Sequence, residues 1–427
     1  MALEHIIIVG AGPAGLVMAL MLGKQGVNVT ILEAADALDK NPRASHYSAP
    51  VVYELKRAGV LDDIKKIGFV PSGVAWRKPD GTKLAALEMK DVPEDEKMVC
   101  LPLDRMTKIV YDHLVKQSTV KVLWNHKVTS KLDQDDKKAR VVVQTPEGEK
   151  TFEADYIIGT DGANSQIRRA LFGDMNFPGF TWDEQVVATN VYYDMSPYNW
   201  GDSSFIIDKE HWVMVAKITN DGMYRISYGE KPGLSYDQLK ERQPWKFKTF
   251  LPGNPDPDKY KIVNFSPYKV HQRCAESLRK GRFLLAADSA HLCNPFGGMG
   301  LTGGLVDAGN LYDCLIGLHK GLVDDSILDK YSDVRRKVYH EVIDPISSGN
   351  IRRMWQDPET VMETDEFLQM CVKVENDPEA SKAMQQGMKI VMHDFTQYYK
   401  NNASAVPDEP EKFNGVAPAP LVAASNA

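Results

Sequence analysis

The most constraining feature of the sequence is an ordered strand, turn, helix and strand within its first 33 residues. His5–Val9 is a short apolar run rich in β-branched residues, typical of a strand buried on both faces. The turn Gly10-Ala11-Gly12-Pro13-Ala14-Gly15 follows at once, and an apolar helix then runs to about Gly26. A second apolar strand ends at Glu33. This order predicts one βαβ unit of about 30 residues and therefore a parallel sheet.

The turn of this unit has the glycine spacing of a dinucleotide-binding site. Gly10 permits the tight turn, Gly12 lets a pyrophosphate approach the backbone, and Gly15 lets helix and strand pack closely. The helix N-terminus supplies free N–H groups and the positive end of a dipole. Glu33 would accept hydrogen bonds from ribose hydroxyls and would repel a 2′-phosphate. The unit therefore predicts bound FAD or NAD rather than NADP, without separating the two.

Composition excludes several other classes of protein. The chain of 427 residues has a net charge of -7 and no stripe of Lys or Arg, which argues against a broad nucleic-acid or anionic-membrane surface. Its five cysteines are scattered, which predicts no disulfide framework and no zinc or other metal site. The N-terminus lacks a signal-peptide pattern and no apolar run reaches about 18 residues. We therefore expect a cytoplasmic protein with no membrane span.

Two later segments distinguish FAD from NAD. The run 157–165 places Asp161 and Gly162 at the end of an apolar strand, and the run 281–291 does the same with Asp288 before the glycine-rich loop 295–300. With these three ordered motifs, the sequence resembles the FAD-dependent aromatic hydroxylases. These are single-component flavoprotein monooxygenases of the para-hydroxybenzoate hydroxylase type, and the resemblance runs from residue 1 to about 345.

The resemblance implies roles for individual residues. The ADP half of FAD would be held by Gly10, Gly12, Ala14, Gly15 and Glu33. Further contacts to the cofactor would come from Arg43, Arg105, Asp161, the ribityl-binding Asp288, and the loop residues Pro295, Gly298, Gly300 and Leu301 along the isoalloxazine. The chain departs from the family at Ala287, Met299 and Thr302, where Gly, Gln and Asn are usual. Other interpretations are a helix cap for Asp288, a simple turn for Asp161 and surface ion pairs for the two arginines.

The candidate catalytic residues besides Pro295, whose carbonyl would face substrate, are His211 and Arg225. Both belong to predicted strands of the second domain, together with Trp212 and Tyr224. Arg225 would pair with a phenolate or carboxylate. His211 would accept a phenol proton, because its reference pKa of about 6.5 suits a base near neutral pH. The competing interpretations are a surface arginine and strand side chains in the core.

The resemblance implies an FAD-dependent monooxygenase. NADPH or NADH would reduce FAD, and O2 would form a C4a-hydroperoxyflavin that hydroxylates a phenolic small molecule. We predict no nucleic-acid partner, and a homodimer is compatible with the sequence. The alternatives are a flavoprotein epoxidase, another FAD-dependent oxidoreductase or a non-catalytic flavin-binding protein. A halogenase and the Baeyer–Villiger class are disfavoured, because the W-x-W-x-I-P signature and a second Rossmann fingerprint are absent.

The expected fold class is α/β, with a Rossmann-like FAD-binding domain interleaved with a β-sheet substrate domain, plus C-terminal helices. Segments broken by Pro and Gly predict a hairpin excursion at 71–96, and period-2 strands predict the rest of the second sheet. The predicted bounds are 1–70, 97–175 and 273–345 for the FAD-binding domain, 71–96 and 176–272 for the substrate domain, 346–400 for the helices and 401–427 for a disordered tail.

Overall fold

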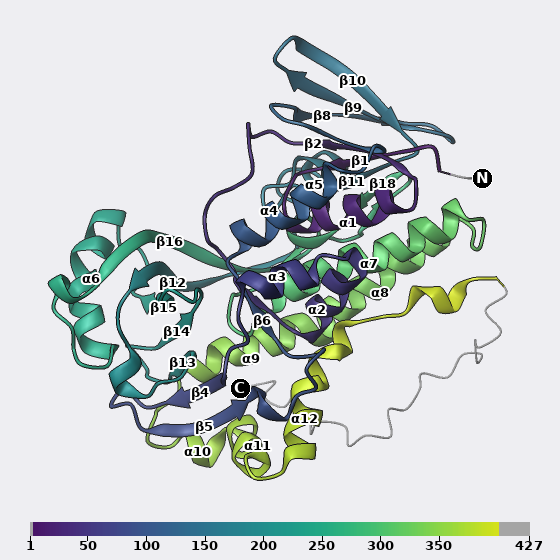
Figure 1. Ribbon diagram of the computed structural model, residues 1–427. Coiled ribbons are helices and arrows are strands. Elements are labelled where there is room, and N and C mark those ends of the chain that lie inside the picture. The colour runs from purple at the N-terminus through teal and green to yellow at the C-terminus, as the bar shows by residue number, and fades with distance from the viewer. Residues whose placement is uncertain (1–2, 401–427) are drawn as a thin grey trace.

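The strand β1 (His5–Val9) lies in the middle of a six-stranded sheet, and its three isoleucine side chains are completely buried. An apolar, β-branched run suits this position, because the strand is covered on both faces. The computed structural model describes residues 3–400, and the predicted tail 401–427 lies outside them (Figure 1). The other strands, in sheet order around β1, are β17 (Arg279–Lys280), β18 (Phe283–Leu285), β11 (Tyr156–Gly159), then β2 (Asn28–Leu32) and β7 (Val120–Leu123). All pairings are parallel except that of β17. The βαβ unit is confirmed.

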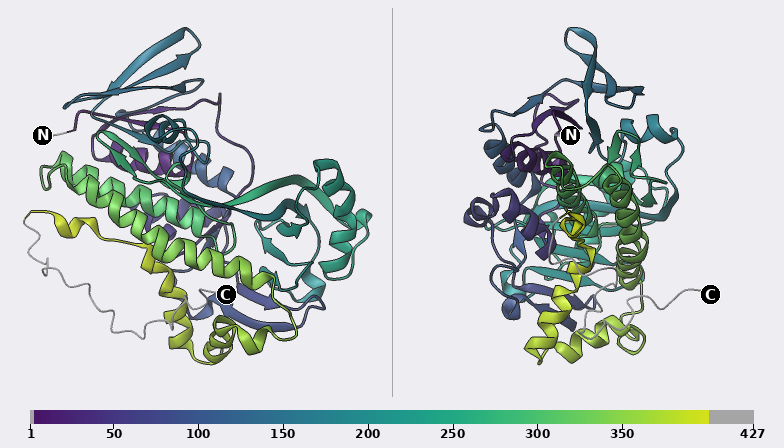
Figure 2. Two further views of the ribbon diagram at one scale, coloured as in Figure 1. Left: turned by 180° about the vertical axis from the view of Figure 1, so that it is seen from behind. Right: turned by 90° about the vertical axis from the view of Figure 1, so that its right-hand side faces the viewer.

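Helices bury the apolar sides of this sheet. The helix α1 (Pro13–Lys24) follows β1 and packs against α7 (Met299–His319), so segments nearly 300 residues apart share one core. The other helices of this half of the molecule are α2 (Ala49–Ala58), α3 (Leu61–Ile67), α4 (Leu103–Leu114), α5 (Gln166–Phe172) and α8 (Ile327–Val338). The last of them, α8, packs along α7 (Figure 2). There are also two small sheets. One pairs β3 (His46–Tyr47) with β6 (Val99–Cys100), and the other consists of β8 (Lys127–Gln134), β9 (Ala139–Thr145) and β10 (Gly148–Ala154).

A second sheet of eight strands forms the other half of the molecule (Figure 1). Its strands, in sheet order, are β19 (His291–Leu292), β16 (Lys261–Cys274), β12 (Gly179–Tyr192), β15 (Met223–Glu230), β14 (Val213–Lys217), β13 (Ser203–Ile206), β4 (Gly73–Arg77) and β5 (Lys83–Glu88). The hairpin β4–β5 joins this sheet through β13, although about 90 residues separate it from β12. The helix α6 (Tyr236–Phe250) covers one face. The interleaved α/β fold is therefore confirmed, while the predicted domain bounds stay predictions.

The chain beyond α8 is helical, as expected. It continues through a π-helical turn into α9 (Asp344–Met354), then α10 (Val361–Thr364), α11 (Glu366–Val374) and α12 (Pro378–Gln386). The helix α11 packs on β5, so the C-terminal helices contact the edge of the second sheet (Figure 2). Among residues 3–400, no helix is long and apolar enough to cross a membrane. The same residues contain no group of three His, Cys, Asp or Glu side chains placed to hold a metal.

The chain passes from one sheet to another at Asp155, because β10 ends at Ala154 and β11 begins at Tyr156 in the parallel sheet. Asp155 causes the break, because its carboxylate accepts hydrogen bonds from the backbone N–H groups of Glu4 (2.6 Å) and His5 (2.9 Å). His211 and Trp212, expected on a strand, lie in the turn before β14.

Candidate active site

In the glycine turn between β1 and α1, protein atoms leave no room for a side chain at Gly10 or Gly15, whereas the space beside Gly12 is empty. Gly10 has φ +106°, and a Cβ there would lie 2.7 Å from the Thr160 carbonyl oxygen. A Cβ on Gly15 would lie 2.3 Å from the Gly10 oxygen. At Gly12 the nearest atom to an added Cβ is 4.0 Å away, and this residue caps α1 without any side-chain hydrogen bond. Space and free N–H groups therefore meet at Gly12, as an approaching pyrophosphate requires.

The acidic residue that follows β2 lies at the same turn. The Glu33 carboxylate accepts hydrogen bonds from the backbone N–H groups of Ala11 (2.7 Å) and Ala35 (2.8 Å). Ala14 is buried in the first turn of α1. The structure thus brings Glu33 and the glycines to one edge of the sheet, where the predicted ADP half of FAD would lie.

The motif after β11 is built around a buried carboxylate. Asp161 accepts hydrogen bonds from the Ser165 hydroxyl (2.5 Å) and from the backbone N–H groups of Gln166 (2.7 Å) and Ile167 (3.2 Å) at the start of α5. Burial nevertheless raises the pKa of Asp161. Arg168 joins this motif to the next one by donating to the Ser289 carbonyl oxygen at 3.0 Å. Asp161 therefore organises the backbone here, and its predicted contact with nucleotides stays a prediction.

Asp288 differs from Asp161 because its carboxylate makes no hydrogen bond to another described residue. It lies in a short turn, Ala287–Ser289, where the Ser289 hydroxyl and not Asp288 bonds the backbone N–H of Ala286. The helix-cap interpretation of Asp288 therefore has no support in the structure. A free carboxylate acceptor is what a ribityl hydroxyl requires.

Replacing Asp288 should separate cofactor binding from folding. We expect Asp288→Ala to bind FAD at least about tenfold more weakly, about 1.4 kcal/mol, because a charge-assisted hydrogen bond is lost. The melting temperature of the apoprotein should stay nearly unchanged, since the carboxylate has no internal partner to lose. Flavin fluorescence titration and thermal unfolding measure the two effects, with Asp288→Asn as the conservative control. Unchanged FAD affinity in Asp288→Ala would remove Asp288 from the site.

The loop before α7 carries the remaining cofactor candidates. Gly297 and Gly298 have φ +96° and +67° and are exposed, whereas Phe296 between them and Pro295 is buried. The helix α7 begins at Met299 and has no acidic residue in its first turn. Gly300 and Leu301 lie in that turn and keep part of their surface accessible. The free end of α7 is therefore available to a developing negative charge on a bound ring.

The two predicted arginines are both on the surface. Arg43 is exposed and forms an ion pair with Asp39 at 2.9 Å, in agreement with the surface-ion-pair interpretation. Arg105 is exposed in the first turn of α4. The backbone around Arg43 has a clearer role, because the carbonyl oxygens of Pro42 and Arg43 accept hydrogen bonds from Arg225 at 3.0 Å and 3.1 Å. The loop after β2 is thereby joined to the second sheet.

The strand register places a set of side chains on the sheet face opposite α6. Residues directly opposite each other in antiparallel strands point to the same face. One row across the sheet consists of Ser203, Ala216, Arg225, Asn190 and Asn264, the next of Phe205, Met214, Ser227, Ala188 and Ser266, and the third of Gly229, Val186 and Tyr268. The Trp212 ring packs on Gly229 and contacts Phe296 of the glycine loop at 5.4 Å between ring centroids.

This register separates the four strand residues singled out in the sequence. Arg225 and Trp212 face the glycine loop and the Pro42–Arg43 segment. Tyr224 packs instead with the α6 cluster. His211 lies on that side too, since its ring contacts Trp245 and its Nδ1 is 3.4 Å from the Lys246 Nζ. Burial and Lys246 lower the pKa of His211. The structure therefore does not bring His211 together with Arg225.

Between the loops and this sheet face, several side chains are closely surrounded by protein yet keep accessible surface, as residues lining a recess do. Burial raises the pKa of Asp288, raises that of Tyr268 to about 12 and lowers that of Arg225. None of the three is fully covered. Burial also raises the pKa of Cys293 to about 12 and lowers that of His46 to about 4. Both side chains keep part of their surface accessible. The Asp288 turn, the segment 42–46 and the second sheet thus adjoin one partly accessible region, which is defined by Asp288, Cys293, Tyr268, Arg225 and His46 and is called the recess.

His46 is a residue that sequence reasoning missed. It lies three residues after Arg43 on β3, with Nδ1 3.0 Å from the Ser45 hydroxyl and Nε2 3.4 Å from Ser203, which belongs to the Arg225 row. At neutral pH its lowered pKa keeps the imidazole uncharged. The only signal in the sequence was its proximity to Arg43, because the partner Ser203 is 157 residues away.

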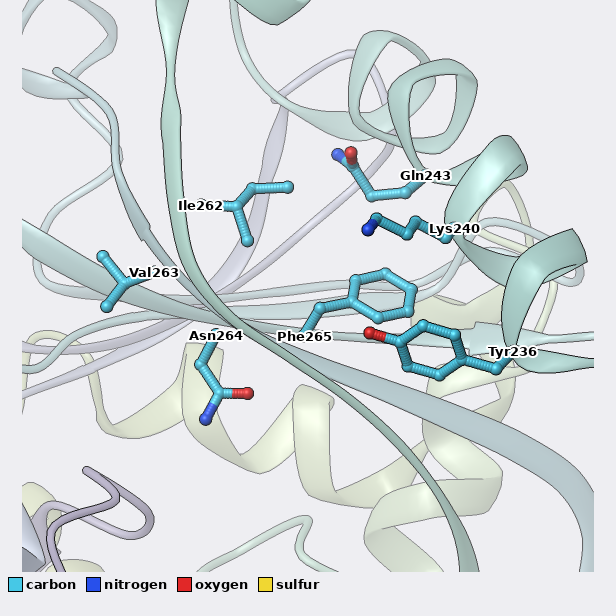
Figure 3. A pocket seen from close by; sticks show the side chains of 7 residues that line it. All are labelled: Tyr236, Lys240, Gln243, Ile262, Val263, Asn264 and Phe265. Atoms are coloured by element: carbon cyan, nitrogen blue, oxygen red, sulfur yellow. The ribbon is translucent and has the colours of Figure 1, made fainter.

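A separate pocket of about 270 Å³ lies between α6 and β16, and the Asn264 side chain points away from the α6 residues there (Figure 3). It is lined by Tyr236, Lys240 and Gln243 of α6 and by Ile262, Val263, Asn264 and Phe265 of β16. None of these residues belongs to the three cofactor motifs. We therefore place the active site at the recess and not at this pocket.

Comparison with known proteins identifies the family of this chain. Residues 4–345 match the family described as "FAD binding domain". The chain is 38% identical over 355 residues to para-nitrophenol 4-monooxygenase of Pseudomonas sp. (strain WBC-3), covering 82% of this chain and 87% of that one. The chain belongs to the FAD-dependent aromatic monooxygenases. Within this family it is also 35% identical to 6-hydroxy-3-succinoylpyridine 3-monooxygenase of Pseudomonas putida (strain DSM 28022 / S16), covering 82% and 89%.

Solved structures of the family have the same fold. The crystal structure of p-nitrophenol 4-monooxygenase from Pseudomonas putida DLL-E4 superposes with a TM-score of 0.85 at 35% identity, covering 92% of this chain and 99% of that one. The predicted FAD cofactor and aromatic monooxygenase activity are confirmed. As an aromatic monooxygenase, the protein acts on an aromatic small molecule. The free Asp288 carboxylate and the open space at Gly12 suit an FAD that spans from the first glycine turn to the recess.

Proposed function

We propose that this aromatic monooxygenase hydroxylates phenols that bind as phenolates, with Arg225 as the anchor of the negative charge. The observation that carries the proposal is that Arg225 is a closely surrounded cation with no carboxylate partner in residues 3–400. Its hydrogen bonds all come from Nη1 and reach the Pro42 and Arg43 carbonyls and the Asn190 side chain. An enclosed cation without a counter-ion is costly unless an anionic ligand compensates it.

The middle row of the sheet face supports an aromatic occupant. Phe205, Met214 and Ala188 are apolar side chains between the Arg225 row and the wall formed by Trp212 and Phe296. Apolar surface with a few fixed polar groups is typical of sites for small aromatic ligands. A ring on this floor would have its charged oxygen toward Arg225 and would be enclosed by the glycine loop.

The names of the relatives support a particular ring position. Para-nitrophenol 4-monooxygenase acts at the carbon that bears the nitro group, para to the hydroxyl. The name 6-hydroxy-3-succinoylpyridine 3-monooxygenase likewise places the reaction at the substituted carbon, para to a ring hydroxyl. We infer that this chain also oxygenates the carbon para to the hydroxyl, including carbons that already carry a substituent.

When bound, FAD takes electrons from NADPH or NADH and uses them to activate O2, so that one oxygen atom enters the ring and the other leaves as water. The chain has to exclude water, orient the ring and remove the phenol proton. The neutral imidazole of His46, with Nε2 toward Ser203 at the end of the Arg225 row, is our candidate for the group that accepts a hydrogen bond from the ring hydroxyl. His211 lies on the α6 side of the sheet and is a weaker candidate.

The reaction is balanced for a para-nitro substrate. A carbon–oxygen bond forms at the ring carbon para to the hydroxyl, and the carbon–nitrogen bond breaks as the nitro group leaves as nitrite. The phenolate oxygen becomes a carbonyl, so the product is a para-quinone. One NAD(P)H, one proton and one O2 are consumed, and one water is released. For a ring with hydrogen at that carbon, the same oxygen transfer gives a hydroquinone.

Steady-state oxidation of NADPH and NADH with a small panel of compounds tests the proposal. We expect 4-nitrophenol and phenol to stimulate oxidation, with nitrite from the first and hydroquinone from the second. The methyl ether 4-nitroanisole should give neither, because it cannot form a phenolate. Equal turnover of 4-nitroanisole would contradict phenolate binding, and ring oxygen at another carbon would contradict the para assignment. A cytoplasmic location and a homodimer belong to the same proposal, and gel filtration with light scattering tests the latter.

A further inference from the structure

A fully buried ion cluster lies directly behind the turn that carries Asp288. Asp307 of α7 is completely buried, and its Oδ1 accepts from the Arg335 Nε at 2.6 Å while its Oδ2 lies 2.8 Å from the His291 Nε2. Arg335, also fully buried, donates to the Val391 carbonyl oxygen at 2.6 Å. These neighbours hold the pKa of Asp307 at about 2, so it is a carboxylate at neutral pH. Burying two full charges in this way requires nearly complete hydrogen bonding.

The Asp307 carboxylate also binds the strained residue of the flavin-side turn. The backbone N–H of Ala287 donates to Asp307 Oδ2 at 2.9 Å. Ala287 has φ +58°, a left-handed conformation that residues with a Cβ disfavour. The other non-glycine residues with positive φ in the described chain are Asn125, Asn199 and Asn254, and asparagine tolerates that region. Ala287 has no polar side chain, so its conformation depends on its surroundings.

Packing against α7 completes the support of this turn. A Cβ on Gly304 would lie 2.8 Å from the Ala287 Cβ, so the turn rests where the helix has no side chain. Asp307 is three residues along the same helix and therefore lies near the same face. One helix thus supplies both the space for Ala287 and the acceptor for its N–H group.

We propose that Asp307 is a positioning residue, whose carboxylate holds Ala287 in its left-handed conformation and so places Asp288 at the flavin recess. The inference rests on the proposed contact between Asp288 and FAD. The positive charge of Arg335 and the hydrogen bonds with His291 and the Ala287 N–H group allow a carboxylate to remain buried behind the turn. Because residue 287 is alanine and not glycine, the positive φ of this turn depends on the support of Asp307.

A rescue experiment tests the proposal through FAD binding alone. Asp307→Asn keeps the side-chain shape but cannot satisfy Ala287, His291 and Arg335 together. We expect it to bind FAD about tenfold more weakly in flavin fluorescence titrations. Adding Ala287→Gly should restore the affinity to within about threefold of the unmodified protein, because glycine adopts positive φ without support. The matched control is Asp313→Asn, a buried carboxylate of the same helix that pairs with Arg57 and does not contact the turn.

The outcomes are distinct. Loss of affinity in Asp307→Asn, its rescue by Ala287→Gly and normal affinity in Asp313→Asn would support the positioning role. Unchanged FAD affinity in Asp307→Asn would overturn it. Loss without rescue would overturn it too, because it would assign the effect to the unpaired Arg335 and a damaged core. Asp288→Ala is titrated in parallel, so that a failure of the assumed Asp288 contact is recognised separately from a failure of the Asp307 role.

A second pair of variants tests the same turn without altering a buried charge, in case Asp307→Asn does not fold. Gly304→Ala places a methyl group against the Ala287 Cβ. We expect it to weaken FAD binding by about tenfold, and the double variant with Ala287→Gly to recover, since the colliding methyl is removed. Normal FAD affinity in Gly304→Ala, or weak binding that persists in the double variant, would contradict the proposal.

Discussion

Substitution of Gly12 by alanine is expected to abolish most FAD binding while leaving the protein folded. Gly12 has φ -74° and ψ 176°, a conformation open to any residue, and the nearest atom to an added Cβ is 4.0 Å away. The methyl group therefore meets no protein atom, and the apoprotein should change by less than about 0.5 kcal/mol in unfolding free energy. The same methyl occupies the space that the pyrophosphate needs. We expect at least about a 100-fold loss of FAD affinity, about 2.7 kcal/mol.

The neighbouring glycine provides the contrasting case. In Gly15→Ala the added Cβ would lie 2.3 Å from the Gly10 carbonyl oxygen and 2.7 Å from the Thr160 hydroxyl. Such a contact should destabilise the apoprotein itself, by about 1–3 kcal/mol. Thermal unfolding of both apoproteins and flavin fluorescence titration distinguish the two variants. A Gly12→Ala protein that retains normal FAD affinity would show that the pyrophosphate does not pass over this residue.

The second large effect is expected at Arg225. Arg225→Ala should lower kcat/KM for 4-nitrophenol by about 10- to 100-fold, because a hydrogen bond to a charged partner contributes about 1.5–3 kcal/mol. Most of the loss should be in KM and in coupling, measured as peroxide released per NAD(P)H oxidised. FAD affinity should stay within about threefold, since no contact of Arg225 involves the three cofactor motifs. Arg225→Lys should retain part of the activity through its charge.

A control for this variant is available on the other side of the same sheet. Arg242 of α6 pairs with the buried Glu230 at 3.1 Å and lies on the face away from the recess. Arg242→Ala should lower the melting temperature because Glu230 would be left unpaired, yet KM for 4-nitrophenol should not change. If Arg225→Ala and Arg242→Ala have the same kinetic effect, Arg225 acts through stability and not through substrate binding.

The cofactor motifs were predictable because each is local in sequence. The residues from His5 to Glu33 form one contiguous unit, and the conformation of its glycines follows from short-range steric limits. Asp161 and Asp288 could be located for a similar reason, since each follows a short apolar strand. Their individual roles were less predictable. Asp161 uses its carboxylate on the start of α5, whereas Asp288 keeps its carboxylate free, and both facts depend on the surrounding backbone.

The substrate side was far less predictable, because neighbouring residues of a strand point to opposite faces. Arg225 was a candidate in the sequence while Tyr224 was noted only on the same predicted strand, and the register shows that Arg225 and not Tyr224 faces the recess. His211 was chosen as the base and lies beside α6, while His46 was overlooked because its partner Ser203 comes from a distant strand. Asp307 is a similar case, since its partners Ala287, His291 and Arg335 meet only when α7 packs behind the turn.

The sequence by itself therefore determined the βαβ unit and its dinucleotide site, and the resemblance carried by its three motifs implied the FAD cofactor and the class of chemistry. The βαβ unit depends on backbone patterns that need only adjacent residues: a buried strand, a glycine turn and the N-terminus of a helix. Only the tertiary structure decided which side chains surround the recess. That choice depends on strand register and on helices packing across nearly 300 residues of chain, and a shift of one residue in register would turn Arg225 to the opposite face.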